Sequence, residues 1–299
     1  MKKTLLAIIA YGSLTCANAQ IFMASDNTNL RMVSSIQIED SEDGMLGQLN
    51  FDYDQDGKLS QMDISSGGTT MSIEYTWSEN YIEGYIVGLP GADAYSFATL
   101  DESGNAIVVG SDLNDVRYYL DYNSDGLLSA ITDNEYNETT NYTWYDGNLV
   151  EEHDMYYSVK KEFSDYPFDM NLSFDEFVNL PDFDVAFICP VNKLNRNLVS
   201  SLTYNDSNSD SYHFEYEFNT DGSVHKIIKK YPGFDILGIP PYDTILTLEY
   251  DTRFPFNSID PIVYNNESAS KSYTLNGQQI KADNEKGLVI KDGKVILMR

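Results

Sequence analysis

FDYDQDGKLSQM, residues 51–62, alternates aromatic or apolar residues with polar ones on both sides of an Asp-Gly pair. Period-two alternation into and out of such a pair is typical of a β-hairpin. The phrase returns as LDYNSDGLLSAI (120–131) and EFNTDGSVHKII (217–228), and with altered turns as YTWSENYIEGY (75–85), TLDESGNAIVV (99–109) and YTWYDGNLV (142–150). The chain is therefore predicted to consist of successive hairpins.

Five anchor positions give this repeat its period: Tyr53, Trp77, Leu100, Tyr122 and Trp144, in steps of 24, 23, 22 and 22 residues. One hairpin per period is an architectural repeat. Connections this short leave no room for parallel crossovers, so neighbouring strands should pair in sequence order. We therefore expect an all-β protein, an antiparallel β-meander curved into a barrel or half-barrel.

The rhythm breaks at residues 163–197, where three prolines interrupt the alternation. Within this stretch Ser-Phe-Asp-Glu at 173–176 is a capping box, which predicts a short helix over residues 173–180. An insertion of this length serves either as a lid or binding loop or as a cap over an open end of the sheet.

The N-terminus carries the features of a signal peptide. Lys2 and Lys3 precede a short apolar run, and Ala17-Asn18-Ala19 fits the small-x-small cleavage rule, so residues 1–19 should be removed. Cleavage before Gln20 is favoured over lipidation at Cys16. The protein is expected to engage the export machinery and to reach the periplasm, the outer-membrane surface or the medium.

The net charge of the chain argues against anionic partners. The net charge of −28 becomes −30 once the two lysines of the signal peptide are removed. Such an acidic chain repels nucleic acid and anionic lipid surfaces. Cys189 is the only cysteine after cleavage, so an exported chain of this kind must be stabilised by core burial without a disulfide of its own.

The composition changes near the C-terminus. Residues 271–299 hold six Lys or Arg against three acids, whereas the rest of the chain is strongly acidic. This shift predicts a β-meander domain at residues 20–267 and a small β unit at residues 268–299.

Two resemblances follow from these motifs. The repeated Y-x-x-x-G-x-L phrase resembles the tyrosine–aspartate hairpin repeats of large bacterial shell-forming proteins. Together with the signal peptide and EYDTRFPF (249–256), it resembles an exported Gram-negative family of unknown function with a porin-like fold, over roughly residues 30–265. The tail, with Y-x-L-x-G-Q (273–278) and K-G-L-x-I-x-x-G-K-V (286–295), is similar to C-terminal sorting domains of type IX secretion, which implies passage across the outer membrane.

A candidate calcium site lies in the first repeat, at Asp52, Asp54, Asp56 and Asp63. With Gly57 they match the twelve-residue calcium loop at several positions, the last with Asp in place of Glu. The flanks alternate with period two instead of the helical period of such loops, and the later copies lack the final carboxylate. The competing interpretation is that Asp before Gly makes each tight turn.

Aromatic residues at alternate positions offer a second candidate site, at Tyr75, Trp77, Trp144 and Tyr145. Aromatic faces stack sugars or line lipid, but cross-strand packing in a core uses the same pattern.

Catalytic signatures are lacking: the sequence contains no phosphate loop, no H-E-x-x-H and no G-x-S-x-G. The leading hypothesis is therefore a non-enzymatic, exported binding or structural module of the cell envelope without a cofactor, with a polysaccharide or another cell-surface molecule as partner. The alternatives are an outer-membrane β-barrel, and a calcium-dependent carbohydrate-binding protein or glycan-active enzyme.

Overall fold

The computed structural model describes residues 21–24, 30–41, 44–87, 95–112, 115–156, 158–173, 188–191, 194–205, 211–233, 241–254, 272–274, 279–280, 287–291 and 294–298. The chain divides into two compact units, Met1–Ser258 and Ile259–Arg299. The predicted signal peptide and Cys16 lie outside the described residues.

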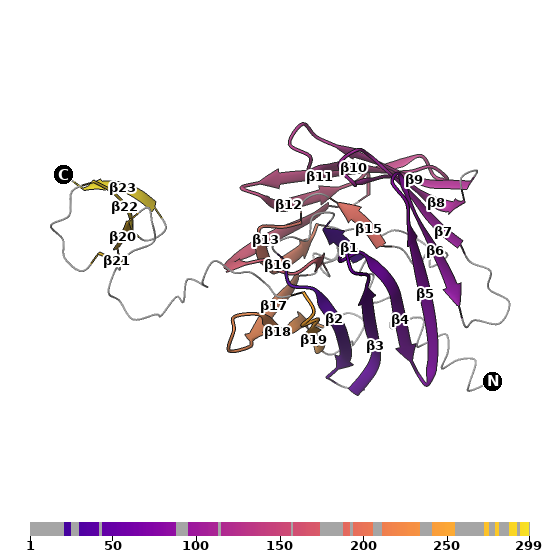
Figure 1. Cartoon of the computed structure of the whole chain (residues 1–299), viewed down its shortest axis with the longest axis horizontal. Coiled ribbons are helices and arrows are strands. Elements are labelled where there is room, and N and C mark those ends of the chain that lie inside the picture. Colours follow the sequence, from indigo (N-terminus) through magenta and orange to yellow (C-terminus); the bar gives the residue numbers. More distant parts are fainter. Residues whose placement is uncertain are drawn as a thin grey trace. The chain divides into compact units, whose positions relative to one another are not determined.

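The first unit is a closed, antiparallel barrel of sixteen strands (Figure 1). Its strands are β2 Val33–Asp40, β3 Gly44–Tyr53, β4 Leu59–Ser66, β5 Thr69–Trp77, β6 Tyr81–Val87, β7 Tyr95–Leu100, β8 Ala106–Asp112, β9 Asp115–Tyr122, β10 Leu128–Asp133, β11 Glu138–Tyr145, β12 Asn148–His153, β13 Ser158–Pro167, β16 Asn197–Tyr204, β17 Ser211–Phe218, β18 Val224–Tyr231 and β19 Tyr242–Tyr250. Neighbours in sequence pair throughout, and β19 pairs with β2 to close the ring. The all-β prediction is confirmed, and the barrel is closed.

A small inner sheet fills part of the barrel. It consists of β1 (Ile21–Ala24) between β14 (Leu172–Ser173) and β15 (Ile188–Val191), and β1 runs parallel to β15. Its strands β1 and β15 lie within the ring of barrel strands (Figure 1). The described residues contain no helix. The helix expected over 173–180 falls outside them except at Ser173, which belongs to β14.

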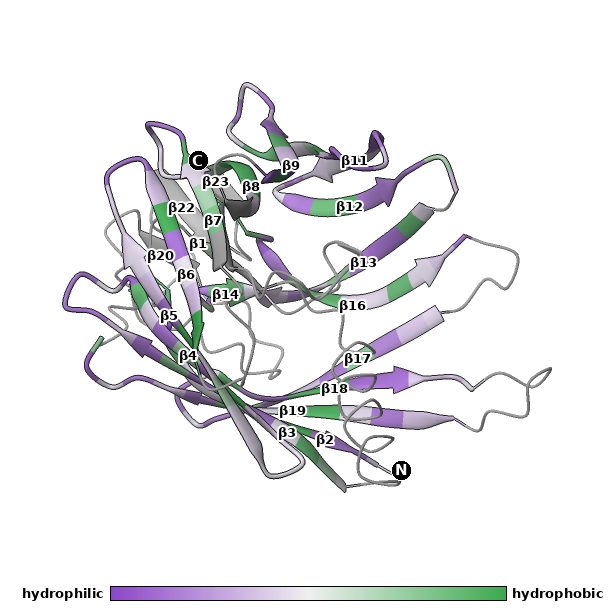
Figure 2. Ribbon diagram, turned by 90° about the vertical axis from the view of Figure 1, so that its right-hand side faces the viewer, coloured by the Kyte–Doolittle hydropathy of each residue, from purple (hydrophilic) through white to green (hydrophobic). Residues whose placement is uncertain are grey.

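The two faces of the barrel wall differ in polarity. Along β5, for example, Ile73 and Tyr75 are buried while Glu74 and Thr76 are exposed. Figure 2 shows the resulting alternation of hydrophobic and hydrophilic bands along the strands. Most of the buried apolar side chains form one cluster with Met23 and Leu172 of the inner sheet, and Val159, Val199 and Leu202 form a second, smaller one. A three-stranded sheet cannot cover the outside of sixteen strands, so the apolar face points inward and the polar face outward.

One tight turn recurs at one end of the barrel. In the turns that begin at Asp54, Asp101, Asn123 and Asn219, the first residue accepts a bond from the glycine three places on and donates to the carbonyl four places on. Each of these glycines has a positive φ of 73–84°, which a residue with a Cβ seldom adopts. A β-bulge follows each turn, so the turns match the predicted Asp-Gly hairpin phrases.

In six hairpins an aromatic side chain joins the two strands at the end opposite the loop that connects them. Each donates a hydrogen bond of 2.6–2.8 Å to the backbone carbonyl of a residue in the preceding strand. We call these six residues the aromatic belt: Tyr53, Trp77, Tyr122, Trp144, Tyr216 and Tyr250. Four of the five predicted anchors belong to the belt. The fifth, Leu100, is buried in the same cluster but has no polar group to donate.

The second unit is a four-stranded antiparallel sheet. Its strand order is β21 (Gln279–Ile280), β20 (Ser272–Thr274), β22 (Gly287–Lys291) and β23 (Lys294–Met298). The sequence predicted a small β unit from residue 268, and the division between the two compact units lies at 258/259.

Replacing Tyr122 by Phe tests the belt. The ring remains, but the carbonyl of Ala106 loses the hydroxyl that donates to it at 2.8 Å. We expect the free energy of unfolding to fall by about 1–2 kcal/mol, measured by urea denaturation followed by circular dichroism. Tyr119→Phe, on the same strand but 43% exposed on the outer face, should change it by less than about 0.5 kcal/mol. Equal effects of the two variants would contradict the role of the belt.

Candidate functional site

The four aspartates of the calcium hypothesis do not converge. Asp54 lies in the first turn, where its Oδ1 accepts hydrogen bonds at 2.9 Å from the backbone N–H groups of Asp56 and Lys58. Asp52 lies on the outward face of β3, and Asp63 accepts hydrogen bonds from Gln61 and Ser72. In the part of the chain that the structure describes, no three His, Cys, Asp or Glu side chains form a group able to hold a metal ion.

The same turn also forms without a carboxylate. In the copy at residues 120–131 the side-chain oxygen of Asn123 accepts from the N–H groups of Asp125 and Leu127 at 2.9 and 3.1 Å. A neutral amide therefore performs the task of the Asp54 carboxylate. This geometry supports the turn interpretation of the repeated aspartates.

Three of the four candidate stacking aromatics face the barrel interior. Tyr75 is buried, and burial raises the pKa of its hydroxyl. The indole nitrogens of Trp77 and Trp144 donate to carbonyls of Leu59 and Leu128, both at 2.7 Å. Tyr145 alone points into solvent, with 75% of its surface exposed.

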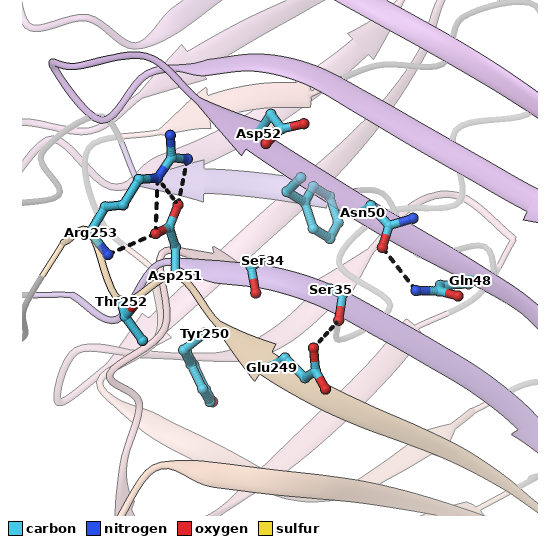
Figure 3. A pocket seen from close by; sticks show the side chains of 11 residues that line it. Ser34, Ser35, Gln48, Asn50, Asp52, Glu249, Tyr250, Asp251, Thr252 and Arg253 are labelled. Atoms are coloured by element: carbon cyan, nitrogen blue, oxygen red, sulfur yellow. Dashed lines mark hydrogen bonds and ion pairs between the residues drawn. The ribbon is translucent and has the colours of Figure 1, made fainter.

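A polar hollow of about 480 Å³ opens on the outer face where the barrel closes, across β19, β2 and β3 (Figure 3). We call it the seam hollow. Its lining residues are Ser34, Ser35, Gln48, Asn50, Phe51, Asp52, Glu249, Tyr250, Asp251, Thr252 and Arg253. Phe51 is buried and Tyr250 donates to the carbonyl of Val224, so both rings also serve the core.

Strand register builds the central row of this hollow. Ser35 of β2 lies opposite Glu249 of β19 on one side and opposite Asn50 of β3 on the other. Ser35 donates to Glu249 Oε2 at 3.3 Å, and Gln48 Nε2 donates to Asn50 Oδ1 at 2.9 Å. The row therefore presents hydroxyl, amide and carboxylate groups side by side.

The rim of the hollow is formed by the segment that follows β19. The guanidinium of Arg253 donates to both carboxylate oxygens of Asp251, at 2.6–3.1 Å. These bonds hold the pKa of Asp251 below its usual range. Of the predicted site residues only Asp52 lines the hollow. The other lining residues come from two segments, 34–51 and 249–253, which no spacing rule in the sequence joins.

A second polar cluster anchors the segment before β14 inside the barrel. Asn171 is fully buried; its Oδ1 accepts from the backbone N–H of Val33 at 2.9 Å, and its Nδ2 donates to the Tyr53 hydroxyl at 3.0 Å. Nearby, Arg31 donates to Asp169 at 2.7 Å and to Asp221 at 2.9 Å. Burial raises the pKa of Asp169, although Arg31 partly offsets this effect. The cluster joins β2, β3 and the insertion, so its role is structural.

Comparison with known proteins identifies the fold. No protein-family model and no curated protein matches the chain. The crystal structure of a porin-like protein from Bacteroides uniformis ATCC 8492 matches with a TM-score of 0.53 and 11% identity, covering 73% of this chain and 98% of that one. A porin-like protein from Bacteroides vulgatus ATCC 8482 gives 0.46 and 13%, covering 74% and 99%.

At these identities the first match shows the fold alone, and the chain has a porin-like β-barrel fold. The predicted porin-like architecture is therefore confirmed. The unknown-function family and the sorting-domain resemblance of the tail stay predictions. Among the described residues, no helix is long and apolar enough to cross a membrane.

The turn interpretation is tested by Asp54→Ala. Removing the carboxylate leaves the N–H groups of Asp56 and Lys58 without their acceptor, so the free energy of unfolding should fall by about 1 kcal/mol. Asp56→Ala, which changes an exposed side chain of the same turn, should have less than half that effect. Thermal unfolding is measured with calcium and with EGTA. A loss that depends on calcium would instead support a metal site.

Asn171→Ala tests the buried cluster. It leaves the Val33 N–H and the Tyr53 hydroxyl short of partners inside the barrel, so we expect a loss of about 2–4 kcal/mol in unfolding free energy. Asn141→Ala, at an exposed position of β11, serves as the control in the same urea titration. A loss under 1 kcal/mol for Asn171→Ala would show that the contact with the insertion is dispensable.

Proposed function

We propose that this chain is an exported cell-envelope protein whose porin-like barrel stands in water and serves as a non-enzymatic binding module. The observation that carries the proposal is which of the two faces of the barrel wall carries the apolar side chains. A membrane barrel places an apolar band outside and polar groups in its lumen. Here the buried inward face is mainly apolar, with the buried charges of Lys161 and Glu152 paired with each other at 4.0 Å, and the outward face carries exposed charges.

These charges are spread around the barrel wall. Glu74 on β5, Asp121 on β9 and Glu215 on β17 are exposed, and each lies between two inward-facing residues of its strand. Cross-strand ion pairs occupy the same face, such as Lys230 with Glu215 at 2.7 Å. Charged side chains in contact with lipid destabilise a barrel, most strongly near the bilayer midplane. An aqueous exterior avoids this loss.

Because its interior is packed, the barrel is better suited to bind a partner at its surface than to conduct solutes through a channel. Porins of sixteen or more strands leave an aqueous channel. In this barrel the belt aromatics and the inner sheet meet in one buried apolar cluster. The described inner face is therefore a core, and the polar groups available to a partner lie outside.

The outer-membrane barrel is the second candidate. Two observations favour it: the likeness in fold to the porin-like protein of Bacteroides uniformis, and one uncharged row on the outer face. In this row Tyr81, Thr99, Val108 and Tyr119 lie opposite one another across β6 to β9. A row of this kind also fits contact with the membrane surface by a barrel that stands in water.

Two adjacent substitutions on β5 separate the candidates. In a water-facing barrel Ile73→Glu, at a position with 0% exposure, places a charge in the core and should cost more than about 4 kcal/mol. Glu74→Leu should change unfolding free energy by less than about 0.5 kcal/mol. Urea denaturation of the mature chain, prepared without detergent, provides both values.

Gel filtration and flotation with liposomes accompany this measurement. We expect a monodisperse species that stays with the aqueous fraction. A mature chain that folds only in detergent, floats with liposomes, and tolerates Ile73→Glu better than Glu74→Leu would establish the outer-membrane barrel instead.

A further inference from the structure

We infer that the seam hollow binds a neutral saccharide chain. Its polar lining combines three carboxylates (Asp52, Glu249, Asp251), one guanidinium (Arg253), two amides (Gln48, Asn50) and three hydroxyls (Ser34, Ser35, Thr252). Donors and acceptors are thus interspersed within one hollow of about 480 Å³, a volume within the range of ligand sites. The inference deepens the proposed function and rests on its aqueous exterior.

The lining argues against other classes of ligand. An apolar molecule would find little surface to cover, because both rings of the lining, Phe51 and Tyr250, serve the core. A phosphate or sulfate would meet three carboxylates and one guanidinium that is already paired with Asp251. A metal ion needs converging ligands, and the described residues form no such group. Neutral hydroxyl-rich ligands and basic peptides remain; the amides and hydroxyls interspersed among the carboxylates favour the neutral ligand, and hexalysine tests the basic one.

The geometry of the strands fits hydroxyl groups. Outward side chains recur about every 7 Å along β3, and adjacent strands lie about 4.8 Å apart. Glu249, Ser35 and Asn50 form one row across the three strands. Each sugar hydroxyl both donates and accepts, as a serine hydroxyl does, so it can pair with an amide on one side and a carboxylate on the other.

The hydrogen bonds within the hollow leave part of this capacity for a ligand. Asn50 accepts through its Oδ1, and its NH₂ group has two hydrogens to donate; Gln48 donates through its Nε2 and keeps its carbonyl oxygen as an acceptor. The hollow is open along the outer face (Figure 3). An open, hydrated site suits a chain that crosses the surface better than a small molecule that must be enclosed.

Affinity electrophoresis of the mature full chain tests this inference. Native gels contain dextran, yeast mannan, xyloglucan or arabinogalactan as defined neutral probes. We expect at least one of them to retard the protein. The double variant Asn50→Ala, Arg253→Ala should raise the apparent Kd at least tenfold.

The control variant is Asn141→Ala, Arg196→Ala. It removes an exposed asparagine of β11 and an exposed arginine that pairs with Asp146 much as Arg253 pairs with Asp251. Its Kd should stay within twofold of the parent protein. Circular dichroism of both variants shows whether either loses the fold, and Asn50→Ala alone replaces the double variant if it does.

Three outcomes overturn the inference. They are the absence of retardation by all four polysaccharides, an equal loss in both variants, and binding of hexalysine at the hollow without any polysaccharide. Each can occur while the chain still folds in water and tolerates Glu74→Leu. Failure of the inference is therefore distinct from failure of the proposed function.

Discussion

The fold depends on a coupling between β-bulges and aromatic donors. A bulge inserts one residue into a strand and takes the local backbone out of the regular ladder. The carbonyls of Leu59 and Leu128 directly precede the bulged residues Ser60 and Ser129. A buried carbonyl needs a donor, and Trp77 and Trp144 supply it at 2.7 Å. The aromatic belt therefore satisfies the backbone and fills the barrel with the same side chains.

Because of this coupling, the repeat can be recognised in the sequence, but the role of its aromatic side chains cannot. Alternation and Asp-Gly pairs predicted strands, turns and pairing order, since these are local properties. Alternation shows that successive side chains point to opposite faces of the sheet, but it does not show which face is buried. The sequence alone therefore does not tell whether Trp77 faces a core, lipid or a ligand. Leu100 occupies an anchor position without a donor, so the sequence period also does not reveal which hairpins are closed by a hydrogen bond.

The buried polar cluster and the seam hollow join segments that are far apart in the sequence. A periodic sequence pattern cannot predict such contacts. Asn171 lies 138 residues from Val33 and 118 from Tyr53, yet its amide bonds to both. The row of the hollow likewise places Ser35 beside Glu249, 214 residues away. Barrel closure is the physical cause in both cases, because it brings the first and last barrel strands together and encloses the insertion.

The seam also accounts for the position of the hollow. In the four tight turns at this end of the barrel that begin at Asp54, Asp101, Asn123 and Asn219, the N–H of the first residue donates to the carbonyl four places on, as Asp54 does to Lys58. At the seam the end of β19 meets the start of β2, and Asp251 N–H donates to the carbonyl of Met32 instead. Asp251 Oδ1 even accepts from the N–H of Arg253, as Asp54 accepts from Asp56. Because no hairpin turn links β19 to β2, Thr252 and Arg253 can lie beside β3. The hollow therefore results from the closure of the barrel.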